Sequence, residues 1–162
     1  MLLRDYRSAC TYYWWRRATR LCLISPRGDY ERTGGMCTTT VLGMLGTDGF
    51  AKELTTLYAK AKAIDDDGLS AYMLTSYYGL PTKTLMNSVA DDLIFIDKVI
   101  GCKLAMSDDR SPFPTEQEIL RIIHQVRLGG FTSGKGGILH IHLGALPEGI
   151  EPYSILLVTI LH

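Results

Sequence analysis

The sequence predicts an α/β protein built on a parallel β-sheet. From Thr38 onward, short apolar runs rich in β-branched residues alternate with stretches of helical periodicity. The runs contain few alternating polar residues, as strands do when both faces of a sheet are covered. Repeated strand, loop and helix units build either an open doubly wound sheet or an arc of a β/α barrel, and periodicity alone does not choose between them.

The composition is that of one soluble domain. The chain has 162 residues, of which 46% are hydrophobic, and its 17 basic residues balance 17 acidic ones. A zero net charge supplies no field that would attract nucleic acid or an anionic membrane, so we expect neither partner. No apolar stretch approaches the roughly 20 residues that span a bilayer, and we expect a cytoplasmic protein.

The first predicted unit is a strand followed by a helix. Residues 38–45 form a β-branched apolar run that Gly46 closes. Asp48 is a candidate helix cap, and apolar residues then recur at helical spacing until about Asp66 and Gly68.

The second predicted unit has the same order. Residues 69–78 read as a strand, and a short helix follows over residues 90–100. Ser88 or Asp91 is its expected cap, and Gly101 is expected to end it.

A third helix is predicted over residues 115–128. Thr115 is in the N-cap position and Glu118 completes a capping box. We expect Gly129 and Gly130 to end this helix. Two further strands are expected at residues 102–107 and 138–144, and a last helix from residue 147 to residue 157.

Polar side chains follow the predicted strands. In both candidate architectures, functional groups gather where strands end and loops begin. The groups at those positions are Thr47, Tyr77, Tyr78, Asp108, Asp109, Arg110 and His142.

The first 37 residues differ from the rest. They hold both tryptophans, three of the four cysteines and seven of the ten arginines, but none of the seven lysines. They show neither helical nor strand periodicity, which predicts an irregular segment at 1–37 and a regular domain at 38–162. An Arg- and Trp-rich arm that lies on a membrane surface or binds an acidic partner is one interpretation. The cysteines match no CxxC pair and are expected to be reduced thiols.

Four sequence blocks identify a family resemblance. LGMLGTDG, SAYMLTSYYGLPTKT, VIGCKLAMSDDRS and RLGGFTSGKGGILHIHLG resemble, in this order and spacing, the central segments of isoaspartyl (β-aspartyl) dipeptidases of the amidohydrolase superfamily. The match spans about residues 38–157. It implies a partial (β/α)8 TIM-type barrel, a two-zinc site, a small dipeptide substrate and a homo-oligomer.

The resemblance assigns two metal ligands. Lys103 matches a lysine that is carboxylated and bridges both zinc ions, and a desolvated amine loses its proton readily enough for that reaction. His142 matches the next zinc ligand, whereas His140 matches no metal position. Without the resemblance, Lys103 reads as a lysine extending from a strand end and either histidine as a buried core residue.

The resemblance also assigns three residues to the substrate. Tyr78 matches the catalytic tyrosine that polarises the scissile carbonyl and contacts the substrate. Arg110 matches an arginine that binds the substrate carboxylate, and Thr47 matches a substrate-contacting threonine. Read alone, Arg110 would form a surface ion pair with Asp108 or Asp109, and Thr47 would be a turn residue.

Several parts of the family site have no counterpart here. The His-x-His pair, glycine run and acidic residue near the family's first strand are absent, as are a later histidine, arginine and aspartate. We therefore expect the chain alone to be inactive. The alternatives are a non-catalytic chain that acts through association with intact barrel subunits, and part of a dihydroorotase-like amidohydrolase.

The genetic code offers an explanation for residues 1–37. The codons for residues 9–16, read one nucleotide later, permit a His-x-His pair and require Gly-Gly when the arginine codon begins with C. We predict that this segment translates a shifted frame of a dipeptidase gene, restored near Thr38. Resequencing the coding DNA tests this, and functional transcripts in the present frame would contradict it.

Overall fold

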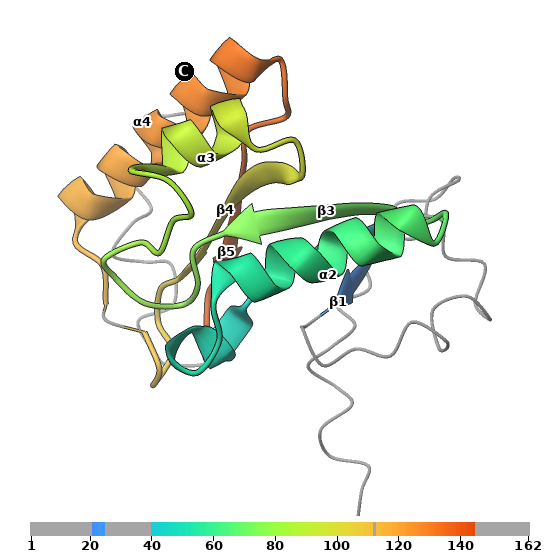
Figure 1. Cartoon of the computed structure of the whole chain (residues 1–162). Coiled ribbons are helices and arrows are strands. Elements are labelled where there is room, and N and C mark those ends of the chain that lie inside the picture. Colours follow the sequence, from blue (N-terminus) through green and yellow to red (C-terminus); the bar gives the residue numbers. More distant parts are fainter. Residues whose placement is uncertain (1–20, 25–39, 112, 145–162) are drawn as a thin grey trace, which may run out of the picture.

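The structure is a parallel sheet flanked by helices (Figure 1). This computed structural model describes residues 21–24, 40–111 and 113–144. The strands pair in parallel in chain order. They are β1 (Leu21–Ile24), β2 (Thr40–Gly43), β3 (Ser70–Thr75), β4 (Val99–Ala105) and β5 (Ile138–His142).

The helices follow the strands. They are the 3-10 helix η2 (Gly46–Phe50) and the α-helices α2 (Leu54–Asp66), α3 (Val89–Phe95) and α4 (Glu116–Ser133). In Figure 1, α2 lies along β3 and α3 lies beside α4. Because the strand order follows the chain without reversal and crossovers share one hand, the helices cover one face of the sheet. This is the arrangement of a β/α barrel arc, so the predicted fold class is confirmed and the doubly wound alternative is excluded.

The helix-side core joins all three α-helices to the sheet. It includes Leu57 from α2, Leu93 from α3 and Ile122 from α4, packed against Met73 of β3 and Leu104 of β4. No helix in the described ranges is both long and apolar enough to cross a membrane.

A β-bulge in β4 changes which residues face the helices. Met73 pairs with Val99 but Leu74 pairs with Gly101, so Ile100 is the extra residue. Val99 packs in the helix-side core, and Ile100 packs with Leu74 on the opposite, inner face. Strict alternation would then send residue 102 inward and residue 103 toward the helices. After the bulge, Cys102 and Leu104 face the helices instead, and Lys103 faces inward.

The predicted caps of two helices are confirmed. The Ser88 hydroxyl accepts a hydrogen bond from the backbone N–H of Asp91 at 3.1 Å and caps α3. Thr115 and Glu118 form both halves of the capping box of α4. The Asp48 prediction was wrong, because the 3-10 helix η2 comes first and α2 begins after Glu53, whose side chain makes no capping bond.

Two predicted helix ends were wrong for the same physical reason. Gly101 lies inside β4, which begins at Val99 rather than at residue 102. A Cβ at position 101 would lie 2.0 Å from the Ile138 carbonyl oxygen of β5, so glycine there permits close strand approach.

Gly129 and Gly130 likewise lie inside α4, which ends at Ser133 with Gly134 as its left-handed C-cap at φ 70°. A Cβ at position 129 would lie 2.8 Å from the Leu93 Cβ of α3. Gly129 therefore permits close packing on α3, and Gly130 permits close approach of the segment around Gly137, so neither terminates the helix.

Two predictions concern the chain ends. Four residues of the 1–37 segment form β1, which pairs with β2 from Leu21↔Thr40 to Ile24↔Gly43. The rest of that segment and the predicted helix at 147–157 lie outside the described residues. The boundary at residue 37 therefore stays a prediction.

The loop between β3 and α3 is organised by one buried carboxylate. Asp92 is fully buried and accepts from the backbone N–H groups of Leu85 at 3.0 Å and Met86 at 2.7 Å, and from the Thr75 hydroxyl. The backbone N–H groups of Leu85 and Met86 would lose their acceptor without this carboxylate.

We expect Asp92→Asn to lower the free energy of unfolding by about 3 kcal/mol, because the amide nitrogen would face backbone donors in a dry site. Urea unfolding followed by circular dichroism measures this change. The matched control is Asp109→Asn, an exposed loop residue that should shift stability by less than about 0.5 kcal/mol. Equal stability of the two variants would contradict this role.

Candidate active site

Polar side chains meet at the carboxyl ends of β3, β4 and β5. Because these strands are parallel neighbours, their ends lie at one edge of the sheet. The residues that converge there are Tyr78, Lys103, Asp108, Arg110, His140 and His142.

Lys103 is a buried amine without a carboxylate partner. Lys103 is 1% exposed, and its Nζ donates to the Leu104 carbonyl oxygen at 3.2 Å and to His140 Nδ1 at 3.0 Å. Among the described residues no carboxylate forms an ion pair with it. Burial lowers the pKa of Lys103 to about 8, so a substantial neutral fraction exists near physiological pH.

The two histidines of β5 occupy different environments. His140 pairs in register with Lys103, and burial together with the Lys103 charge lowers its pKa to about 4. His140 is therefore a neutral acceptor. His142 lies one pair further along, opposite Ala105, and its Nε2 is 3.0 Å from Asp108 Oδ2.

Tyr78 lies between the charged groups. Its ring stacks on His142 with centroids 4.9 Å apart, and Lys103 Nζ lies 4.8 Å from the ring centroid. Arg110 Cζ lies 5.6 Å from the same centroid. Burial raises the pKa of the Tyr78 phenol, so the hydroxyl keeps its proton at neutral pH and can donate a hydrogen bond.

Arg110 forms a bidentate ion pair with Asp108. Its Nε lies 2.6 Å from Oδ1 and its Nη2 lies 2.8 Å from Oδ2, while its backbone N–H donates to Oδ1 at 3.0 Å. These donors, with His142, hold the pKa of Asp108 well below its usual range. The pair expected from sequence therefore forms with Asp108, and the exposed Asp109 is not its partner.

Tyr77 packs rather than acts. It is buried with its ring against Gly49 and Gly79, where a Cβ would lie 2.2 Å and 2.5 Å from Tyr77 atoms, and it meets Phe50 edge-on. Thr47 is exposed on η2, which joins the site loop through the Tyr78 N–H bond to the Gly46 carbonyl at 3.3 Å. The structure thus brings together Tyr78, Lys103, Arg110 and His142, and leaves Thr47 at the margin.

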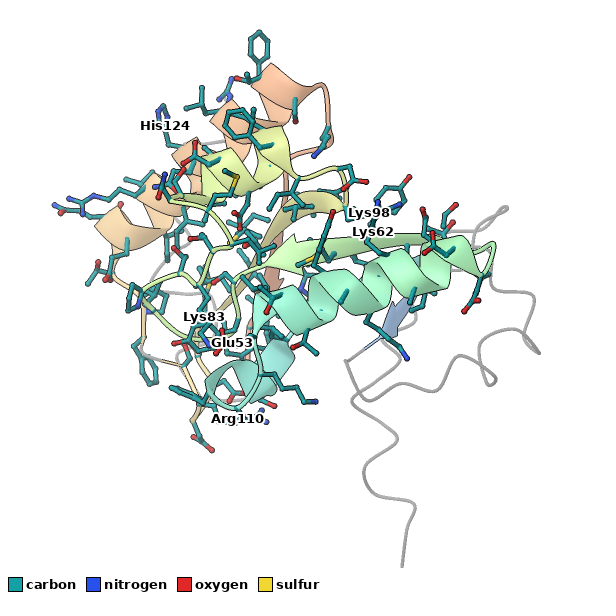
Figure 2. All side chains as sticks on the ribbon, viewed as in Figure 1. Glu53, Lys62, Lys83, Lys98, Arg110 and His124 are labelled. Carbon is teal, nitrogen blue, oxygen red and sulfur yellow. The ribbon has the colours of Figure 1, made fainter. Side chains whose placement is uncertain are left out.

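Lys83 fixes the loop that carries Tyr78. Its Nζ donates to the Gly49 carbonyl at 2.8 Å and to Glu53 Oε1 at 3.0 Å, and Figure 2 shows Lys83 beside Glu53. The loop after β3 is thereby tied to the loop after β2. Sequence reasoning did not find this link, because the two partners lie 30 residues apart.

The residues fit a metal site in chemistry but not in number. Within the described ranges, no group of three or more His, Cys, Asp or Glu side chains is arranged to hold a metal ion. Lys103 and His142 lie on the same face of neighbouring strands and both contact the Tyr78 ring. A buried amine with a lowered pKa suits carboxylation, and an imidazole suits zinc.

Comparison with known proteins identifies the family. No protein-family model matches the chain. The crystal structure of a β-aspartyl dipeptidase from the thermophilic, keratin-degrading Fervidobacterium islandicum AW-1 matches 75% of the chain at 45% identity, with a TM-score of 0.72. A second structure of that organism's β-aspartyl dipeptidase, in complex with a β-Asp-Leu dipeptide, matches 71% at 47% identity, with a TM-score of 0.69. The chain belongs to the β-aspartyl dipeptidase family. It spans 34% of the length of the first structure and 30% of the second.

We expect Lys103→Met to raise the free energy of unfolding of this dipeptidase-family chain by about 1–3 kcal/mol at pH 7, because it removes a buried charge to which residues 40–111 and 113–144 offer no counter-ion. The folded-state pKa is below that of the unfolded chain, so between about pH 8 and pH 10.4 the unfolded state binds more protons. The stability of the Lys103 chain therefore rises across this interval, and the advantage of methionine shrinks.

Urea unfolding of both chains at several pH values measures the difference. The control is Lys62→Met, an exposed lysine that pairs with Asp97 at 3.2 Å, which should change stability by less than about 1 kcal/mol. A Lys103→Met chain that is less stable at pH 7 would contradict the cost assigned to the buried amine.

Proposed function

We propose that the chain supplies the β3 to β5 portion of a zinc-dependent β-aspartyl dipeptidase active site, and that the chain alone is inactive. The observation that carries this proposal is the buried Lys103 amine, which lies over the Tyr78 ring that stacks on His142 and has no carboxylate partner in the described part of the chain. Such a costly arrangement is typical of a functional site. The match to a dipeptidase solved with β-Asp-Leu supports the substrate class.

Lys103 and His142 would hold the zinc. The neutral Lys103 amine can add carbon dioxide, forming an N–C bond and releasing one proton, and the resulting carbamate presents oxygen donors. Its lowered pKa favours that neutral form. When bound, zinc supplies Lewis acidity toward the substrate carbonyl and toward water. Two ligands do not close a zinc site, so the remaining ligands must come from outside the described residues.

Tyr78 and Arg110 would act on the dipeptide. The Tyr78 phenol, kept protonated by burial, would donate a hydrogen bond to the oxygen of the scissile carbonyl as negative charge develops there. Arg110, whose side chain is 57% exposed, would bind the free carboxylate of the substrate through its guanidinium plane. Thr47, which is exposed on η2, would contact the substrate from the neighbouring strand end.

The direct test is complementation. The purified chain is assayed for zinc content and β-Asp-Leu hydrolysis, alone and mixed with a polypeptide carrying the remaining two thirds of the Fervidobacterium enzyme. We expect zinc retention and hydrolysis only in the mixture. Hydrolysis by the chain alone would overturn the predicted inactivity, and cleavage of dihydroorotate instead of β-Asp-Leu would indicate a different amidohydrolase.

Two substitutions in the complemented enzyme test the assigned roles. Tyr78→Phe should lower kcat by about 10²-fold, because it removes an oxyanion donor, whereas Tyr72→Phe on the exposed β3 surface should leave kcat unchanged. Arg110→Lys should mainly raise KM, since lysine cannot form the planar bidentate contact. Full activity of Tyr78→Phe would remove the tyrosine from the mechanism.

A further inference from the structure

Asp108 joins two groups that the proposed reaction uses separately. The residue is 8% exposed, and among the described residues the four close contacts of its carboxylate involve Arg110 or His142. Oδ1 accepts from the Arg110 backbone N–H and from its Nε. Oδ2 accepts from Arg110 Nη2 and lies 3.0 Å from His142 Nε2.

We propose that Asp108 is a positioning residue that fixes the His142 tautomer, so that Nε2 carries the proton and Nδ1 presents its lone pair to the metal. This inference rests on the proposed function, because it assumes that His142 is a metal ligand. It adds which nitrogen binds and which group selects that nitrogen.

The assignment follows from what a carboxylate can do. A bidentate arginine partner keeps the Asp108 carboxylate ionised, and an ionised carboxylate only accepts hydrogen bonds. The contact to His142 therefore requires the proton on Nε2. A neutral imidazole has one proton, so Nδ1 keeps its lone pair, and Nδ1 has no hydrogen-bond partner among the described residues. Carboxylates commonly orient metal-bound histidines in this way.

The same carboxylate sets the orientation of Arg110. Three of the four contacts go to that arginine, which would otherwise be a long exposed side chain with many rotamers. Asp108 thus holds the histidine and the substrate-binding arginine at a fixed separation. Its substitution should affect both metal binding and substrate binding, whereas loss of either partner alone affects one.

Asp108→Asn should invert the tautomer rather than merely loosen it. The Arg110 backbone N–H and Nε both donate to the Oδ1 position, so the asparagine carbonyl is expected to occupy that position. The amide NH₂ then faces His142 Nε2 and donates to it. Nε2 becomes the acceptor and the proton moves to Nδ1, so that Nδ1 no longer has a lone pair available for a metal ion.

The test is nitrogen-15 NMR of the metal-free full chain with labelled histidine, at about pH 8.5, roughly two units above an ordinary histidine pKa. The signal of His142 is assigned among the four histidines by its loss in His142→Gln. We expect a protonated Nε2 in the wild type and in Asp109→Asn, and a protonated Nδ1 in Asp108→Asn. Asp108→Glu, which keeps the carboxylate, should restore the wild-type pattern. A protonated Nδ1 in the wild type, or an unchanged pattern in Asp108→Asn, would overturn the proposal.

A second measurement uses the complemented enzyme. Zinc affinity should fall by about 10- to 100-fold in Asp108→Asn, and recover at least in part in Asp108→Glu. Because the tautomer is read without metal, a failure of β-Asp-Leu hydrolysis would reject the proposed function and leave the tautomer assignment standing. Normal hydrolysis with the opposite tautomer would reject only the role of Asp108. The backbone amide spectrum of each variant establishes that it is folded.

Discussion

The inserted residue Ile100 determines which side chains of β4 point to the inner face of the sheet. Before it, β4 alternates in one phase, and after it the phase is reversed. Lys103 therefore points away from the helices and toward His140 of β5. With a regular strand, the amine would enter the apolar helix-side core and Leu104 would occupy its place. The contacts of Lys103 with His140 and with the Tyr78 ring depend on that single insertion.

Two buried charges in this molecule illustrate opposite solutions to the same physical problem. Asp92 is fully buried, but backbone donors and the Thr75 hydroxyl surround it, so its charge stabilises the loop that leads to α3. Lys103 is equally buried, and its acceptors among the residues that the structure describes are neutral. The first is a structural arrangement that satisfies its charge within the fold. The second leaves a charge unmatched, which is the condition under which a group from outside the chain would bind favourably.

Local features of the fold could be predicted from the sequence, and features that depend on contacts between distant elements could not. The capping box of Thr115 and Glu118 was predicted correctly, and Ser88 is one of the two caps that were predicted for α3; both features depend on neighbours within a few residues. Gly101, Gly129 and Gly130 were predicted to end helices, but they lie inside elements at points of close contact. Glycine is favoured both at helix ends and where two segments approach closely, so the residue type alone does not distinguish the two. The family resemblance indicated Lys103 and His142, but the contact between His142 and Asp108 joins residues 34 positions apart, and no periodicity reports it.

Gly101 links the spacing of two strands to the geometry of the site. It lies where β4 and β5 approach closely, with an added Cβ only 2.0 Å from the Ile138 carbonyl oxygen. A methyl group there would push apart two strands whose next residues are Leu139 and Cys102, followed by the His140 and Lys103 pair. A substitution at this position would therefore disturb the spacing of β4 and β5, the strands that carry Lys103 and His142. Because that spacing serves the sheet as well as the site, glycine is needed at this position whether or not the chain contributes to catalysis.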